Sequence, residues 1–110
     1  MPVTMQTAER TMTAKLSGEL DHHHTQKLRE EIDRSVLKER PGRLVLDFGG
    51  VEFMDSSGIA IVIACVRRMR QLRGEVLLRS VPPQPLKVLK ASGIERIAKL
   101  EEERSLVHET

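Results

Sequence analysis

The chain has no tryptophan, no tyrosine and only two phenylalanines among its 110 residues. Proteins that bind single-stranded nucleic acid usually stack bases on aromatic side chains, so this class of partner is disfavoured. The charges agree with this, because 18 basic and 16 acidic residues give a net charge of only +2. Because the two signs of charge are nearly balanced, the sequence does not predict a general polyanion-binding surface. We therefore expect no direct contact with nucleic acid.

Long apolar runs are also missing. No stretch reaches the roughly 20 residues needed to cross a bilayer, and the longest one, Ile59–Val66, ends at two arginines. The first 20 residues are polar and alternating, without the apolar segment of a signal peptide. The single cysteine, Cys65, excludes an internal disulfide, and its apolar neighbours predict a buried, inert thiol. These absences predict a cytoplasmic protein that does not contact membranes.

The residues that are present predict an α/β domain. Hydrophobic residues make up 39% and charged residues 31%, which is ordinary for a globular protein, and the length suits one domain with one modest core. A predicted hairpin followed by alternating helices and strands favours a mixed, mostly parallel sheet with the helices mainly on one face. The predicted strands are Val3–Ala8, Thr11–Ser17, Arg43–Phe48, Glu75–Arg79 and Ile97–Leu100, and the predicted helices are His23–Lys38, Ser57–Leu72, Leu86–Ser92 and Glu101–His108.

Three local features refine this prediction. Leu28, Ile32 and Val36 recur every four residues and define the buried stripe of the first helix. Gly49–Glu52 is expected to form a loop after the central strand. Gly74 is expected to end the second long helix in the left-handed conformation.

The most informative stretch is Phe53–Gly58, which reads Phe-Met-Asp-Ser-Ser-Gly. It lies between the apolar run Leu44–Phe48 and the apolar segment that begins at Ile59, so it should join a buried strand to a buried helix. A serine at a helix N-terminus can cap the free backbone amides. The same amides and the helix dipole also favour an added phosphate. Capping and a phosphorylation switch therefore both explain the serine pair.

A serine hydrolase is an alternative interpretation of the same residues. Ser56 or Ser57 would be the nucleophile, one of the histidines at 22–24 the base, and Asp21 the orienting acid. However, the motif lacks the first glycine of the Gly-x-Ser-x-Gly elbow. A substrate pocket is also hard to build in so short a chain. The pattern disfavours an enzyme.

The triplet His22, His23 and His24 could supply metal ligands, but no other histidine or cysteine lies near it in the sequence. Consecutive side chains point to different faces, so they rarely share one ion, and packing within a surface loop is the simpler interpretation. Asp21, just before them, is a good residue for the N-cap of the first helix. No glycine-rich phosphate loop is present, so we expect neither a metal nor a cofactor.

Two segments resemble the bacterial anti-sigma factor antagonists of the STAS-domain family. Gly18–His23, which reads Gly-Glu-Leu-Asp-His-His and precedes a helix, is similar to a segment near the start of these proteins. Phe53–Gly58 is similar to their phosphorylation motif. The likeness extends over nearly the whole chain. It implies that residues 1–110 form a single domain with the STAS fold, and that the protein is a regulator and not an enzyme.

The resemblance also implies partners. In the family the second serine of the motif is phosphorylated, which is Ser57 here. The kinase is the anti-sigma factor itself; the unmodified antagonist binds it and frees the sigma factor, and a PP2C-type serine phosphatase reverses the phosphorylation. The Asp-His-His segment favours the sporulation branch, and the alternatives are a general-stress antagonist or a STAS subunit that acts by binding alone, for example in a transporter.

Further residues are expected to contact the kinase. Asp21 would do so beside the phosphorylation site, and Gly58 would leave room for the kinase to reach the hydroxyl. Met54 and Ile59 would supply apolar contacts, with core packing as the alternative. The full set of expected contact residues is Asp21, His22, His23, Met54, Asp55, Ser56, Gly58 and Ile59.

Overall fold

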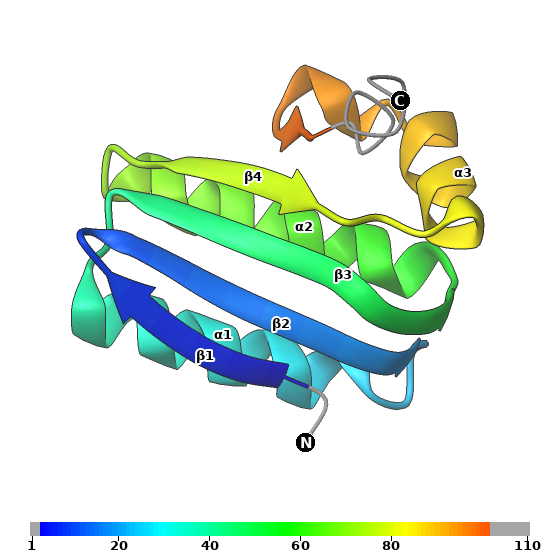
Figure 1. Ribbon diagram of the computed structural model, residues 1–110, viewed down its shortest axis with the longest axis horizontal. Helices are drawn as coiled ribbons and strands as arrows, with labels where there is room; N and C mark the ends of the chain where they lie inside the picture. Colours follow the sequence, from blue (N-terminus) through cyan, green and yellow to red (C-terminus); the bar gives the residue numbers. More distant parts are fainter. Residues whose placement is uncertain (1–2, 102–110) are drawn as a thin grey trace, which may run out of the picture.

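The computed structural model describes residues 3–101 and contains one five-stranded sheet (Figure 1). The strands lie in the order β1-β2-β3-β4-β5; β1 is antiparallel to β2, and the other neighbours are parallel. The strands are β1 Val3–Ala8, β2 Thr11–Leu20, β3 Arg43–Met54, β4 Glu75–Arg79 and β5 Lys99–Leu100. The helices are α1 Thr25–Glu39, α2 Ser56–Gln71, α3 Pro83–Ala91 and the 3-10 helix η1 Ile94–Arg96.

Helices α1 and α2 both cover the same face of the sheet (Figure 1). Each connects two parallel strands, and crossovers of the same hand that advance in the same direction place their helices on one face. Helix α3 lies beyond the end of β4 (Figure 1). The predicted α/β class, the mostly parallel sheet and the one-sided helices are confirmed.

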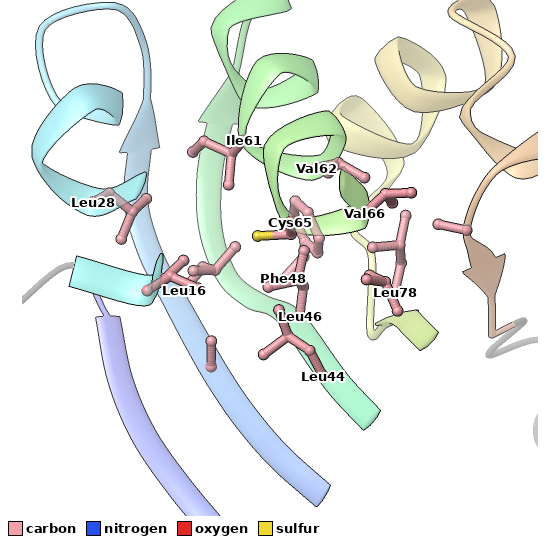
Figure 2. Close-up of a cluster of buried hydrophobic side chains, with 14 of the residues drawn as sticks. Leu16, Leu28, Leu44, Leu46, Phe48, Ile61, Val62, Cys65, Val66 and Leu78 are labelled. Carbon is pink, nitrogen blue, oxygen red and sulfur yellow. The ribbon is translucent and has the colours of Figure 1, made fainter. Parts of the chain in front are cut away.

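The core lies between the sheet and these two helices. Figure 2 shows side chains of β3, such as Leu46 and Phe48, directed toward Cys65 of α2 and its neighbours. Leu46 and Phe48 have no exposed surface. The predicted stripe of α1 is confirmed, because Leu28, Ile32 and Val36 are each only 1% exposed. Each such side chain contributes about 1.5–3 kcal/mol when fully buried.

The loop expected at Gly49–Glu52 is not formed, because β3 continues to Met54. Instead, β3 contains two β-bulges, because it carries one extra residue at each of two points along its pairing with β2. The glycines lie at the first of these points. The flanking partners are Lys15 with Asp47 and Ser17 with Gly50 at the first point, and Gly18 with Val51 and Glu19 with Phe53 at the second. Glycine within a strand often marks such a bulge, so the sequence signal was real but misread as a loop.

The end of α2 also differs from the expectation. Arg73, with φ of 60°, takes the left-handed conformation that was expected of Gly74. Gly74 is required for a different reason: a Cβ there would lie 2.7 Å from the Gly42 carbonyl oxygen. The glycine therefore permits close contact with the segment that leads into β3.

Smaller differences concern the ends of elements. Helix α1 begins two residues later than expected, at Thr25, and β2 extends to Leu20. Helix α3 begins earlier, at Pro83, which suits the first turn because proline lacks the amide that would be unpaired there. The short η1 was not predicted. The predicted helix Glu101–His108 lies outside the described residues, apart from Glu101, which follows β5. Among residues 3–101, no helix is both long enough and apolar enough to span a bilayer.

Candidate phosphorylation and partner-binding site

Asp55, and neither serine, caps helix α2. Its backbone is extended, with φ of −107° and ψ of −168°, and its Oδ1 accepts a hydrogen bond of 2.7 Å from the amide of Ser57. Ser56 and Ser57 are the first two helical residues. Within the described part of the chain, neither serine side chain takes part in a hydrogen bond. The capping explanation of the serine pair is therefore wrong, and both hydroxyls are left for other chemistry.

The two serines differ in their surroundings. Ser56 is exposed, whereas Ser57 is half-buried. Ser57 lines a shallow groove of about 200 Å³ between the first turns of α1 and α2. The other residues of this groove are His22, Thr25, Gln26, Arg29, Ala60 and Ile61. Ser57 is thus the serine that borders a structured surface.

Asp21 was predicted to be the N-cap of α1, but it instead shapes the turn before this helix. The residue at the N-cap is His24, whose side chain makes no capping bond. The Asp21 carbonyl accepts from the amides of His24 and Thr25, each at 3.1 Å, and its Oδ1 accepts from the His23 amide at 3.0 Å. The capping signal therefore reflected a tight turn that begins three residues before the cap.

The carboxylate of Asp21 also pairs with the ring of His24, with Oδ1 2.7 Å from Nδ1. Desolvation opposes ionisation of Asp21, but the hydrogen bonds from the His24 side chain and the His23 amide outweigh it, so the pKa of this carboxyl lies below its usual value. The Asp21 side chain is consequently charged around neutral pH. The rings of His22 and His23 lie beside one another, with centroids 4.1 Å apart.

The parallel pairing of β2 and β3 brings the Asp21 and Asp55 turns together. Leu20 is the register partner of Met54, and the Asp55 amide donates to the Leu20 carbonyl at 3.2 Å. Both strands end at the same edge of the sheet, so the two turns leave it side by side. The two motifs that carry the family resemblance therefore form one surface.

Three of the expected contact residues have a structural role. Met54 has no exposed surface, so its side chain cannot meet a partner in this conformation; it belongs to the core. Gly58 is also buried, and the Met54 side chain beneath it leaves no room for a Cβ at this position. Ile59 is partly buried and packs against the core.

Two residues near the site were not expected. Phe53 is 44% exposed, as the alternation of side chains along a strand requires of the residue before the buried Met54. The two bulges together add two residues, so this alternation stays in step with the buried Phe48. Gln84 of α3 forms two hydrogen bonds with the backbone of Met54, and nothing in its local sequence indicates this contact.

The geometry does not assemble the hydrolase considered above. His24, which is paired with Asp21, is not among the residues that line the groove of Ser57; His22 lies there instead. The described residues contain no hydrogen bond between a serine of the motif and a histidine. Between residues 3 and 101, no three His, Cys, Asp or Glu side chains are grouped so that they could hold a metal ion.

Comparison with known proteins agrees with this arrangement. The family model described as the STAS domain matches residues 2–105. The chain belongs to the STAS domain family. The chain is 31% identical over 84 residues to the anti-sigma F factor antagonist of Lysinibacillus sphaericus, covering 76% of this chain and 72% of the relative.

Solved structures extend the likeness of this STAS chain to three dimensions. The anti-sigma factor antagonist SpoIIAA in its unphosphorylated form is 26% identical, with a TM-score of 0.78 over 96% of this chain and 92% of that one. The phosphorylated form of SpoIIAA, described as a Bacillus cell fate determinant, is also 26% identical, with a TM-score of 0.69 over 97% of each chain.

Proposed function

We propose that this STAS protein is an anti-sigma factor antagonist that is switched by phosphorylation of Ser57. The unmodified form binds an anti-sigma factor that is also a serine kinase, and so releases the sigma factor. Phosphorylation ends the interaction, and a PP2C-type phosphatase restores it. The resemblance of the Asp21–His23 segment to the sporulation branch favours a sporulation sigma factor as the one it serves. The protein acts by binding and does not itself catalyse a reaction.

The observation that carries this proposal is the setting of Ser57. Its amide is held by Asp55, its hydroxyl makes no hydrogen bond among residues 3–101, and its side chain borders the groove beside the Asp21 turn. A kinase can reach such a hydroxyl without unfolding the helix. The named relatives, which are anti-sigma factor antagonists, support the same conclusion.

The switch requires no change of fold. A phosphate adds about −1.5 to −2 charges at neutral pH, and at the second position of α2 the helix dipole partly offsets this charge. A partner packed over Ser57 would have to bury that charge next to the Asp55 carboxylate. A penalty of about 2.7 kcal/mol is enough to weaken binding about 100-fold.

The test is phosphorylation by an anti-sigma F kinase with ATP, followed by intact-mass analysis and fragmentation. We expect one phosphate, on Ser57. Ser57→Ala should stay unmodified and bind the kinase persistently, whereas the matched control Ser56→Ala should be phosphorylated like the wild type. Phosphate on Ser56 would show that the wrong serine had been chosen. No phosphate, with a known substrate modified in parallel, would favour a STAS protein that acts by binding alone.

Binding of the modified protein completes the test. Calorimetry should show that phosphorylated protein binds the kinase at least about 100-fold more weakly than the unmodified protein. Equal affinities would contradict the electrostatic mechanism even if Ser57 carries the phosphate.

A further inference from the structure

Gln84 contacts the backbone of Met54, the second residue of the phosphorylation motif, through both polar atoms of its side-chain amide. Its Oε1 accepts from the amide of Met54 at 2.9 Å, and its Nε2 donates to the carbonyl of the same residue at 2.8 Å. One side-chain amide thus satisfies both backbone groups of one strand residue. A neighbouring strand would normally supply these two bonds.

This contact occurs where β3 has lost its neighbour on one side. Strand β4 pairs with β3 only as far as Asp47, whereas β2 pairs with it up to Met54. The last residue of β3 therefore has β2 on one side and the Gln84 side-chain amide on the other. Unpaired backbone groups are costly when partly buried, so Gln84 replaces the strand that is no longer there.

The start of α3 holds this amide in place. Pro82, Pro83 and Pro85 surround Gln84, and each proline ring restricts its own φ. Pro85 and Leu89 are buried, which anchors the helix. The side-chain amides of asparagine and glutamine carry a donor and an acceptor on one small planar group, and glutamine has the longer reach.

The contact is linked to Ser57 through short steps. Met54 is followed by Asp55, whose amide bonds to Leu20 and whose carboxylate holds the Ser57 amide. The side chain of Met54 also lies directly beneath Gly58. A shift of the Met54 backbone would therefore displace the serine from both directions.

We propose that Gln84 is a positioning residue for the phosphorylation site, holding the end of β3 so that the Ser57 hydroxyl stands in a fixed place for its kinase. This role rests on the proposed function, since it concerns the modification of Ser57. Phosphoryl transfer depends on an accurately placed acceptor, and small displacements slow it strongly. Loss of the contact should lower kcat for phosphorylation with little effect on KM.

Gln84→Glu is the sharpest variant. Its carboxylate can still accept from the Met54 amide, but it has no proton to give to the Met54 carbonyl, so two oxygens face each other. A glutamate in the first turn of α3 is favoured by the helix dipole, which should keep the fold intact. Gln6→Glu is the matched control. It makes the same chemical change away from the site, because Gln6 is exposed on β1.

The experiment combines kinase kinetics with amide hydrogen exchange followed by NMR. At pH 7.5 we expect kcat for Gln84→Glu to be about 10-fold below wild type, with KM nearly unchanged. Gln6→Glu should match the wild type in both constants. In Gln84→Ala, the Met54 amide should exchange at least about 10-fold faster, since its partner is gone.

The outcomes separate the two proposals. Unchanged exchange at Met54 in Gln84→Ala would overturn the positioning role whatever the kinase does. Faster exchange with an unaltered kcat would also overturn it, since Gln84 would then support only the strand. Failure of the wild type to become phosphorylated would instead overturn the proposed function and, with it, the role of Gln84 in that reaction.

Discussion

Gly58 lies directly against the side chain of Met54: a Cβ atom built on Gly58 would stand 2.3 Å from Met54 Cγ and 2.4 Å from its Sδ. Met54 has no exposed surface, so its side chain has little space into which it can move. The last residue of β3 and the first turn of α2 therefore pack closely because position 58 has no side chain.

Gly58→Ala should destabilise the protein by up to about 2 kcal/mol, because overpacking costs about 1–3 kcal/mol. Alanine returns at most about 1 kcal/mol of helix propensity, since position 58 lies in the first turn of α2. Urea unfolding measures the difference. In a Met54→Ala background the same change should cost nothing or stabilise the helix, and an equal cost in both backgrounds would contradict the contact.

The cap on α2 allows a second prediction. Asp55→Ala should cost about 1 kcal/mol, because the Ser57 amide loses its partner. Asp55→Asn should cost much less, since an asparagine oxygen caps equally well. Thermal unfolding of both variants measures this. If asparagine proves as costly as alanine, the charge of Asp55 matters and the hydrogen bond does not.

Burial of Cys65 raises the pKa of its thiol from 9.0 to about 12, with a smaller contribution from the nearby charge of Asp33. Because the thiolate is the reactive form, iodoacetamide at pH 8 should modify the native protein at least about 100-fold more slowly than the protein in guanidinium chloride. Mass spectrometry follows the reaction. Equal rates would show that the thiol is accessible.

The same pKa predicts a dependence of stability on pH. The folded state holds the Cys65 proton more tightly than the unfolded chain does. The contribution of the protonated thiol to the free energy of unfolding is therefore complete below about pH 9 and is lost as the pH rises toward 12. Cys65→Ala should remove this part of the alkaline loss. A stability profile between pH 8 and 11 that is identical in the two proteins would contradict the prediction.

Helices α1 and α2 are joined by Arg68 and Asp33, with Nε 2.7 Å from Oδ1 and the second nitrogen, Nη2, 3.1 Å from Oδ2. Arg68→Lys loses this two-point contact. The pair is about one-third exposed, so we expect a cost of at most about 1 kcal/mol that falls in high salt. Arg67→Lys, on the exposed side of α2, is the control and should leave the free energy of unfolding unchanged.

The parts of the fold that the sequence predicted are those governed by local periodicity. The spacing of Leu28, Ile32 and Val36 was sufficient to place α1 and its buried face. The glycines at 49 and 50 were ambiguous, because the same pair serves in a loop or in a bulged strand. Only the pairing with β2, which lies more than 30 residues earlier, decides between the two.

The site shows the same limit. The motif placed Ser57 at the start of a helix, but Asp55 and the serines are all good caps, and the choice depends on where β3 ends. Gln84 lies 30 residues from Met54, and its contact follows from the path of the chain after β4. Local patterns indicated the chemistry of the site, and tertiary contacts decided which atoms carry it.

The spatial order of the strands is the same as their order along the chain. Each new strand that leaves the ribosome therefore finds its partner already in place and needs no later insertion between existing strands. Such growth from one end favours folding during synthesis. Ser57 lies three residues after the end of β3, and β3 can pair with β2 before β4 and α3 have been made. Ser57 would thus be tethered early, and Gln84 would complete its surroundings later in translation.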